Sequence, residues 1–206
     1  SIGVPTSGAA APYPATREVS GLTRPIADVN VKLDGIWATN ADALEMVLVS
    51  PAGRAVRLLS DVCGSTDIFD RTWTVDDEAT AEFPNSGPCP SGSYRPAQGS
   101  SSPAIAPPAP APPYDPSLSA FDGESGNGQW RLFVQNDSAS ANAIGKGFSL
   151  DITQQPAPPS PLAPPAPPAP PAGGPKAASA FAASSAFTLP SAKACLKRGA
   201  KLKLAF

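Results

Sequence analysis

LEMVLVSPAGRAVRLLSD, residues 44–61, predicts a β-hairpin around which the remaining strands are arranged. Leu44, Met46 and Leu48 follow the period of two that a strand requires, and the valines between them make the opposite face apolar as well. SPAG, residues 50–53, has the composition of a turn, because proline suits its second position and glycine its last. A strand that is apolar on both faces is typical of the interior of a packed sheet rather than of an edge. We therefore expect the neighbouring segments to cover this hairpin.

Short alternating segments before and after the hairpin predict an all-β fold. They are residues 26–33, 71–75, 129–134 and 148–152. Turn-forming Gly, Pro and Asp separate them, and the helical period is nearly absent. Many short strands joined by such turns are typical of sandwiches and jelly rolls. The sequence thus predicts a jelly-roll β-sandwich of about eight strands.

The three tryptophans of the chain divide between core and surface. Trp73 and Trp130 lie on alternating apolar faces, which favours burial over a role as sugar-stacking platforms. Asp34-Gly35 has turn chemistry, so we expect residues 36–42 to form a loop. Trp37 falls in that loop and is the candidate for an exposed contact with a ligand, with a buried position as the alternative.

Proline and charge are distributed unevenly along the 206 residues. Residues 156–175 contain 11 of the 28 prolines. Residues 1–155 carry 17 acidic and nine basic side chains, a net charge of −8, whereas residues 156–206 carry six basic and no acidic side chains. Such asymmetry indicates separate parts. We expect an N-terminal linker (1–12), a jelly-roll domain (13–155), a disordered Pro/Ala-rich linker (156–185) and the start of a truncated second β module (186–206).

A second proline-rich segment, residues 103–116, holds seven prolines and lies between predicted strands. Its composition favours an extended polyproline conformation. Because strands resume after it, we expect a long loop across the surface of the domain, and an inter-domain linker is the alternative.

Several classes of function are excluded or disfavoured by composition. The chain contains no histidine, so it cannot build a Ser-His-Asp or Cys-His site or a histidine-ligated zinc site. No apolar run reaches the 18 residues of a membrane span. GESGNG, residues 123–128, does not join a strand to a helix as a phosphate-binding loop does. The basic cluster at 193–203 has too few aromatic residues for nucleic-acid binding. We expect no catalysis by this chain, no nucleic-acid partner and no membrane span.

Cysteine usage leaves two interpretations open. Cys63 and Cys89 both fall in loop-like sequence of the first domain, and they form either an extracellular disulfide or two free thiols. Cys195 is then left without a partner in the first domain.

Carboxylates near the hairpin predict calcium as a cofactor. The loops and strand ends around it carry Asp42, Glu45, Asp61, Asp67, Asp76 and Asp77. Calcium takes six to eight oxygen ligands, often from loops rich in carboxylates. Solvated turn residues and side-chain caps are the alternative for the same set. Asn136-Asp137-Ser138 fits a glycosylation sequon, and a hairpin turn explains it equally well.

Seven stretches of the first domain carry a family resemblance: GLTRPIADVNVKLDG (21–35), ALEMVLVSPAGRAVRLLSD (43–61), TWTVDDEA (72–79), PNSGPCPSGSYRP (84–96), YDPSLSAFDG (114–123), GNGQWRLFVQND (126–137) and GKGFSLDIT (145–153). Together they resemble the P domain, or P/Homo B domain, of subtilisin-like proprotein convertases, in the bacterial form found beside secreted proteases. The most specific part is the spacing of Gly128, Trp130, Leu132 and Val134. Ala38 and Ala43 stand where the family often has His and a second Asp, and Glu45 stands for a later Asp.

The resemblance implies an eight-stranded jelly roll in a secreted or cell-surface protein of bacterial type. In the convertases this domain packs beside the subtilisin-like domain and supports its folding. We therefore expect a non-catalytic accessory or binding module, whose partner is an adjacent domain of the parent chain. Two alternatives stay open. The chain is part of a serine endopeptidase whose catalytic domain lies upstream, or it is a jelly roll that binds carbohydrate or a protein ligand in adhesion.

Overall fold

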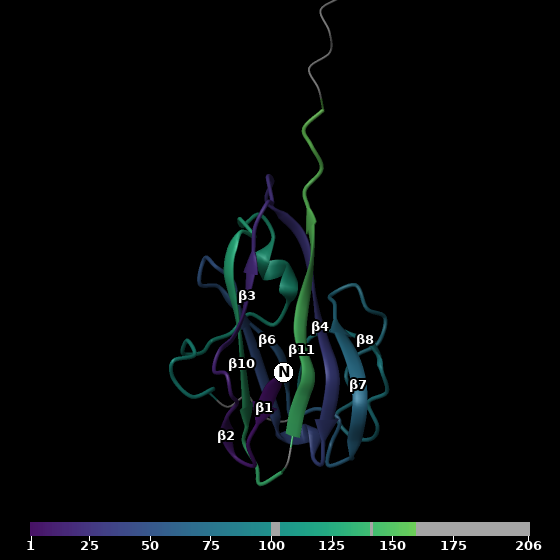
Figure 1. The fold of residues 1–206 in the computed structure, drawn as a ribbon. Coiled ribbons are helices and arrows are strands. Elements are labelled where there is room, and N and C mark those ends of the chain that lie inside the picture. The colour runs from purple at the N-terminus through teal and green to yellow at the C-terminus, as the bar shows by residue number, and fades with distance from the viewer. Residues whose placement is uncertain (100–103, 141, 160–206) are drawn as a thin grey trace, which may run out of the picture. The chain divides into compact units, whose positions relative to one another are not determined.

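Two β-sheets stack face to face in the computed structural model, which describes residues 1–99, 104–140 and 142–159. One sheet has the order β1 (Ile2–Val4), β11 (Asn142–Gln154), β4 (Ile26–Ala38), β7 (Ile68–Val75) and β8 (Gly92–Tyr94). The other has the order β2 (Gly8–Ala9), β10 (Gly128–Asn136), β5 (Leu44–Val49), β6 (Ala55–Ser60) and β9 (Ala97–Gln98), and β3 (Ala15–Val19) also pairs with β10. Figure 1 shows the two layers. The predicted all-β sandwich is confirmed, and the described helices are two short 3-10 turns, η1 (Ala41–Ala43) and η2 (Leu118–Phe121).

The predicted hairpin forms the middle of the second sheet. β5 and β6 pair antiparallel, and the amide of Gly53 donates to the carbonyl of Ser50 at 3.0 Å to close the turn. All six residues of β5 are buried. Leu44, Met46 and Leu48 belong to the main core between the sheets, as their spacing predicts.

The opposite face of β5 is buried by the proline-rich segment. Val47, Val49, Phe133 and Ile105 form a separate buried cluster, against which Tyr13, Ala55, Ala109 and Tyr114 pack. Ile105 and Tyr114 come from the described part of the proline-rich loop, residues 104–116, so this loop crosses the outer face of the second sheet. In Figure 1 it lies outside β10, away from β11 and β4. This packing explains why β5 is apolar on both faces.

The main core confirms the predicted burial of two tryptophans. Trp73 and Trp130 are fully buried, and each satisfies its indole N–H with a backbone carbonyl, that of Cys89 at 3.3 Å and that of Gly126 at 2.9 Å. Phe121 of η2 packs edge-on against Trp130, with ring centroids 5.0 Å apart. Because both indole N–H groups are hydrogen-bonded, the two large rings are buried without leaving an unsatisfied donor.

Two local expectations differ from the structure. Residues 1–12, predicted as a linker, contribute β1 and β2, because Ile2 and Val4 bury their side chains where β1 pairs with β11. The strand that turn chemistry predicts to end at Asp34-Gly35 continues to Ala38 as β4. Gly35, at φ +72°, is an extra residue between two paired positions, and the strand bulges there instead of turning. The predicted linker beyond residue 159 and the predicted second module lie outside the described residues.

A disulfide joins Cys63 to Cys89, 26 residues apart in sequence. It connects the segment after β6 to the segment before β8, and both half-cystines belong to the main core. The disulfide fits an extracellular protein, because oxidising compartments preserve such bonds. In the part of the chain that the structure describes, no helix is long and apolar enough to cross a membrane.

We expect the disulfide to contribute substantially to stability. Replacing Cys63 and Cys89 together by serine should lower the free energy of unfolding by about 3 kcal/mol, because the unfolded chain regains the entropy of a 26-residue loop. Urea unfolding in a Cys195→Ser background measures this, and the Cys195→Ser single variant is the control. A double variant as stable as this control would contradict the expectation.

Candidate functional site

A pair of exposed aromatic side chains marks the outer face of the first sheet. Trp37 on β4 is 37% exposed and Phe69 on β7 is 54% exposed, and they are the exposed large hydrophobic side chains of the described residues. Their ring centroids lie 6.3 Å apart and the ring planes are inclined by 52°. The predicted exposure of Trp37 is confirmed, although Trp37 lies on a strand and not in a loop.

Backbone irregularities bring this pair to the surface. Ala38 pairs with Ile68 and Ile36 pairs with Arg71, so β7 has one residue more than β4 over this interval. Asp70 takes up the irregularity with φ +48°. A bulge of this kind redirects side chains, and Phe69 and Asp70 are both exposed as a result. Sequence periodicity could not predict Phe69 as a surface residue, because the bulge interrupts the alternation.

A polar cluster lies beside the aromatic pair on the same face. Lys146 of β11 lies close to Gly35 of β4, where a side-chain carbon would come within 3.2 Å of the lysine Cγ. The Lys146 Nζ lies 3.2 Å from Asp70 Oδ1 and 4.0 Å from Asp34 Oδ1. Thr72 Oγ1 donates to Asp34 Oδ1 at 2.6 Å. This hydrogen bond, followed by nearby lysine charge, lowers the pKa of Asp34. The aromatic pair, Asp34, Asp70, Thr72 and Lys146 together form the aromatic–polar face.

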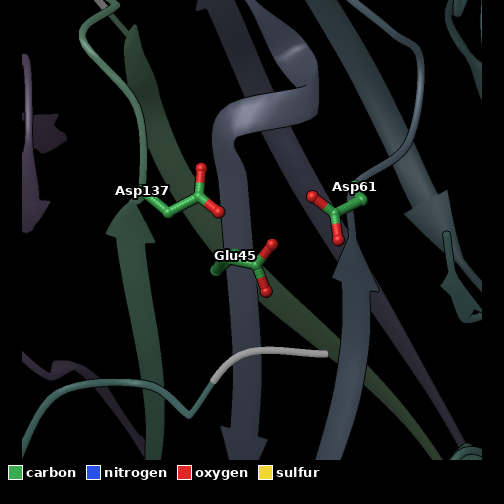
Figure 2. A group of neighbouring side chains, drawn as sticks. All are labelled: Glu45, Asp61 and Asp137. Carbon is green, nitrogen blue, oxygen red and sulfur yellow. The ribbon is translucent and has the colours of Figure 1, made fainter. Parts of the chain in front are cut away.

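A second candidate site is an acidic group on the other sheet. Figure 2 shows the carboxylates of Glu45, Asp61 and Asp137 pointing toward one another. One oxygen from each lies within 4.8 Å of the others. Glu45 belongs to β5, while Asp61 and Asp137 directly follow β6 and β10. Because β5 runs antiparallel to both neighbours, its beginning lies beside both of their ends. The amide of Asp137 donates to the carbonyl of Ala43 at 3.1 Å, which holds the turn there.

Burial governs the electrostatics of this acidic group. Burial raises the pKa of Glu45 to about 7, while hydrogen bonding from Ser60 and the charge of Arg57 act in the opposite direction. Burial is also the main cause of the raised pKa of Asp42 and of Asp137, and repulsion from Asp61 adds to it in both. Burial and mutual repulsion therefore both disfavour the charged forms of Asp42, Glu45 and Asp137, although Asp137 is exposed.

Glu45 already has partners of its own within the protein. Arg57 Nη1 forms a buried ion pair with Glu45 Oε2, and Ser60 Oγ donates to Glu45 Oε1 at 3.0 Å. A guanidinium thus occupies the place that a cation would take at this carboxylate. Asp61 and Asp137 are the carboxylates better suited to hold calcium, which needs six to eight oxygens in total.

The six predicted calcium residues are not brought together as one group. Glu45 and Asp61 meet, and repulsion from Asp61 adds to the burial that raises the pKa of Asp42. Asp67 precedes β7, whereas Asp76 and Asp77 follow its other end. Asp76 Oδ1 accepts the amide of Glu78 at 2.8 Å. Asp77 accepts the amides at the start of η2, from Leu118 at 3.0 Å and from Ser119 at 2.7 Å. These last two carboxylates cap turns, the alternative that their sequence leaves open.

Asp137 was not among the predicted ligands. The feature of the sequence that points to Asp137 is its position directly after the alternating run that ends at Asn136. Asn136 pairs with Leu44, which puts Asp137 beside the start of β5. That register could not be deduced from the sequence, because 78 residues, 50–127, lie between the two strands.

Asn136, the first residue of the predicted glycosylation sequon, stabilises the turn after β10 by hydrogen bonds of its side chain. Asn136 is 1% exposed, and its amide nitrogen donates to the carbonyls of Pro5 at 2.8 Å and Ser140 at 2.7 Å. Its oxygen accepts the amide of Ser138 at 3.1 Å. A glycan on this nitrogen is incompatible with these contacts, so the hairpin-turn interpretation holds in the folded domain.

Comparison of the chain with protein-family models, with curated proteins and with solved structures gives no match.

The free energy of unfolding should fall with rising pH as Glu45 loses its proton. Its pKa rises from 4.5 in the unfolded chain to about 7 in the fold, so the folded state binds more protons between these values. The contribution of Glu45 to stability is therefore lost as pH rises from about 4.5 to 7. Urea unfolding of the wild type and of Glu45→Gln at pH 5 and pH 8 measures it. The wild type should lose about 2.5 kcal/mol more than the variant, and equal losses would show that Glu45 stays ionised throughout.

Proposed function

We propose that the described domain is a non-catalytic binding module of a secreted or cell-surface protein. It contacts a ligand, or an adjacent domain of the parent chain such as a subtilisin-like catalytic domain, through the aromatic–polar face. The observation that carries the proposal is the exposed Trp37–Phe69 pair. Aromatic side chains are enriched among the residues that contribute most to binding. Two of them held together on a rigid sheet need little ordering when a partner arrives.

The chemistry of the chain supports a module without catalysis. The sequence has no histidine, and Cys63 and Cys89 are consumed in a disulfide. Ser60 and Glu45 resemble a hydroxyl nucleophile and its base, because Ser60 Oγ donates to the carboxylate. Both side chains are fully buried, at 0% exposure, so no substrate reaches that hydroxyl. Nucleophilic catalysis needs an accessible nucleophile next to its base.

The first test of the proposal is the absence of hydrolysis. The purified 206-residue chain should show no turnover of fluorogenic peptide substrates or of nitrophenyl glycosides above a buffer blank. Heat-denatured protein is the control for contaminating enzymes. Reproducible turnover that a serine-directed inhibitor abolishes would contradict the proposal and would favour a serine endopeptidase.

Calcium is the cofactor that we propose for this module, held by Asp61 and Asp137 with Glu45 beneath them. Their oxygens lie within 4.8 Å of one another, and repulsion from Asp61 contributes to the raised pKa of Glu45 and of Asp137. A cation there would offset this repulsion and tie together the ends of β6 and β10. Arg57 already neutralises Glu45, so the two aspartates would provide most of the affinity.

Calcium should raise the melting temperature of the chain more than magnesium does at matched ionic strength. Binding to the folded state stabilises it by about 2.7 kcal/mol at a hundredfold excess over Kd, whereas screening by salt acts equally for both ions. Asp61→Asn and Asp137→Asn should remove the difference. Asparagine is chosen because Asp61 has φ +50°, which asparagine tolerates. Asp67→Asn is the matched control and should keep the difference. Equal shifts for both ions in the wild type would rule calcium out.

A further inference from the structure

We propose that the aromatic–polar face binds a neutral polysaccharide. The inference rests on the proposed function and names its ligand. It draws on three features of the described residues: the exposure of the two rings, the polar side chains beside them, and the charge of the domain.

The rings offer apolar surface of the size that sugar rings need. The axial C–H groups of a pyranose form an apolar face that stacks on an aromatic ring. Ala143 of β11 pairs with Trp37, and Gly3 of β1 pairs with Ala143. Small residues thus flank the indole on the side toward β1. The inclination of 52° between the two rings presents surfaces in two orientations, which suits successive sugars of a twisted chain.

Hydrogen-bonding groups lie at a suitable distance along the same strands. Asp34 precedes Trp37 by three residues, which is about 10 Å along a strand. This length is comparable with that of a disaccharide. Asp34 and Asp70 can accept hydrogen bonds from sugar hydroxyls, while Lys146 can donate to them. Lys146 is held between these two carboxylates, so the polar cluster is in place before a ligand binds.

Charge and composition favour a neutral sugar over the other ligand classes. Residues 1–155 carry a net charge of −8, which disfavours polyanions such as polyuronates and nucleic acids. A protein partner needs about 800 Å² of complementary surface, and Lys and Asp are depleted at the centre of such interfaces. Here the two rings share their face of the sheet with Asp34, Asp70 and Lys146, and the described residues expose no further large hydrophobic side chain.

The test uses the position of the tryptophans. Trp73 and Trp130 are fully buried and Trp37 is exposed, so acrylamide quenching of the fluorescence of the 206-residue chain reports mainly on Trp37. Cellohexaose, xylohexaose and mannohexaose are titrated in turn, with calorimetry for affinity and quenching for position. We expect at least one of them to bind and to protect Trp37 from acrylamide. A hexamer of galacturonate, the anionic comparison, should bind more weakly.

Variants locate the site. Trp37→Ala and Phe69→Ala should each weaken binding by about tenfold or more, which corresponds to about 1.4 kcal/mol. Lys146→Ala should weaken it too. Thr153→Ala is the matched control, because Thr153 is exposed on β11 near the far end of the strand. All four changes are at exposed side chains, so unchanged melting temperatures show that the variants fold.

Each other outcome overturns the inference. It fails if none of the three neutral oligosaccharides binds, if binding leaves Trp37 unprotected and survives Trp37→Ala, or if galacturonate binds best. These failures are separate from failure of the proposed function, which substrate turnover by the same chain would show. A chain that neither hydrolyses substrates nor binds neutral sugars retains the proposed function with a different partner.

Discussion

Burial of β5 on both faces is the constraint on which the rest of this structure depends. Leu44, Met46 and Leu48 face the main core, and Val47 and Val49 face the outside of their own sheet. Exposing the valines would leave a strip of apolar surface in the middle of the sheet, where water is a poor solvent for it. The proline-rich loop across this face supplies the missing cover. The domain therefore has two apolar cores, one on each face of the second sheet.

Arg57 connects this second core to the acidic group. Its guanidinium forms the buried ion pair with Glu45, and its Cζ lies 4.8 Å from the ring centroid of Tyr114 in the proline-rich loop. The backbone of Arg57 also holds the proline-rich loop against β6, because its amide donates to the carbonyl of Asp115 at 3.0 Å. Both side chains of this pair are buried, so each charge depends on the other for compensation. One side chain thus serves both the fold and the charge balance of the candidate cation site.

The aromatic–polar face arises from irregularity in the other sheet. Register shifts occur in neighbouring strands at the same level: at Gly35 in β4, at Asp70 in β7, and between Ile144 and Gly147 in β11. Each bulge adds a residue whose side chain, if it has one, turns away from the core. The extra residues on β7 and β11 provide Asp70 and Lys146, which meet across the glycine of β4. The irregular pairing thus brings aromatic, acidic and basic side chains together on the solvent-facing side of the first sheet.

Sequence alone determined the all-β class, the central hairpin and the burial of Trp73 and Trp130. These features follow from periodicity and turn chemistry, which act between residues close in the chain. The exposure of Trp37 was one of two alternatives that the sequence left open. The sequence also offered the Cys63–Cys89 disulfide as one of two alternatives, and the structure decided between them. Tertiary structure alone decided that residues 1–12 join the sheets, that Phe69 accompanies Trp37, and that Asp137 meets Glu45 and Asp61 while Asp67, Asp76 and Asp77 do not. These depend on register and bulges between strands that are distant in sequence, and a shift of a single residue reverses the face on which a side chain lies.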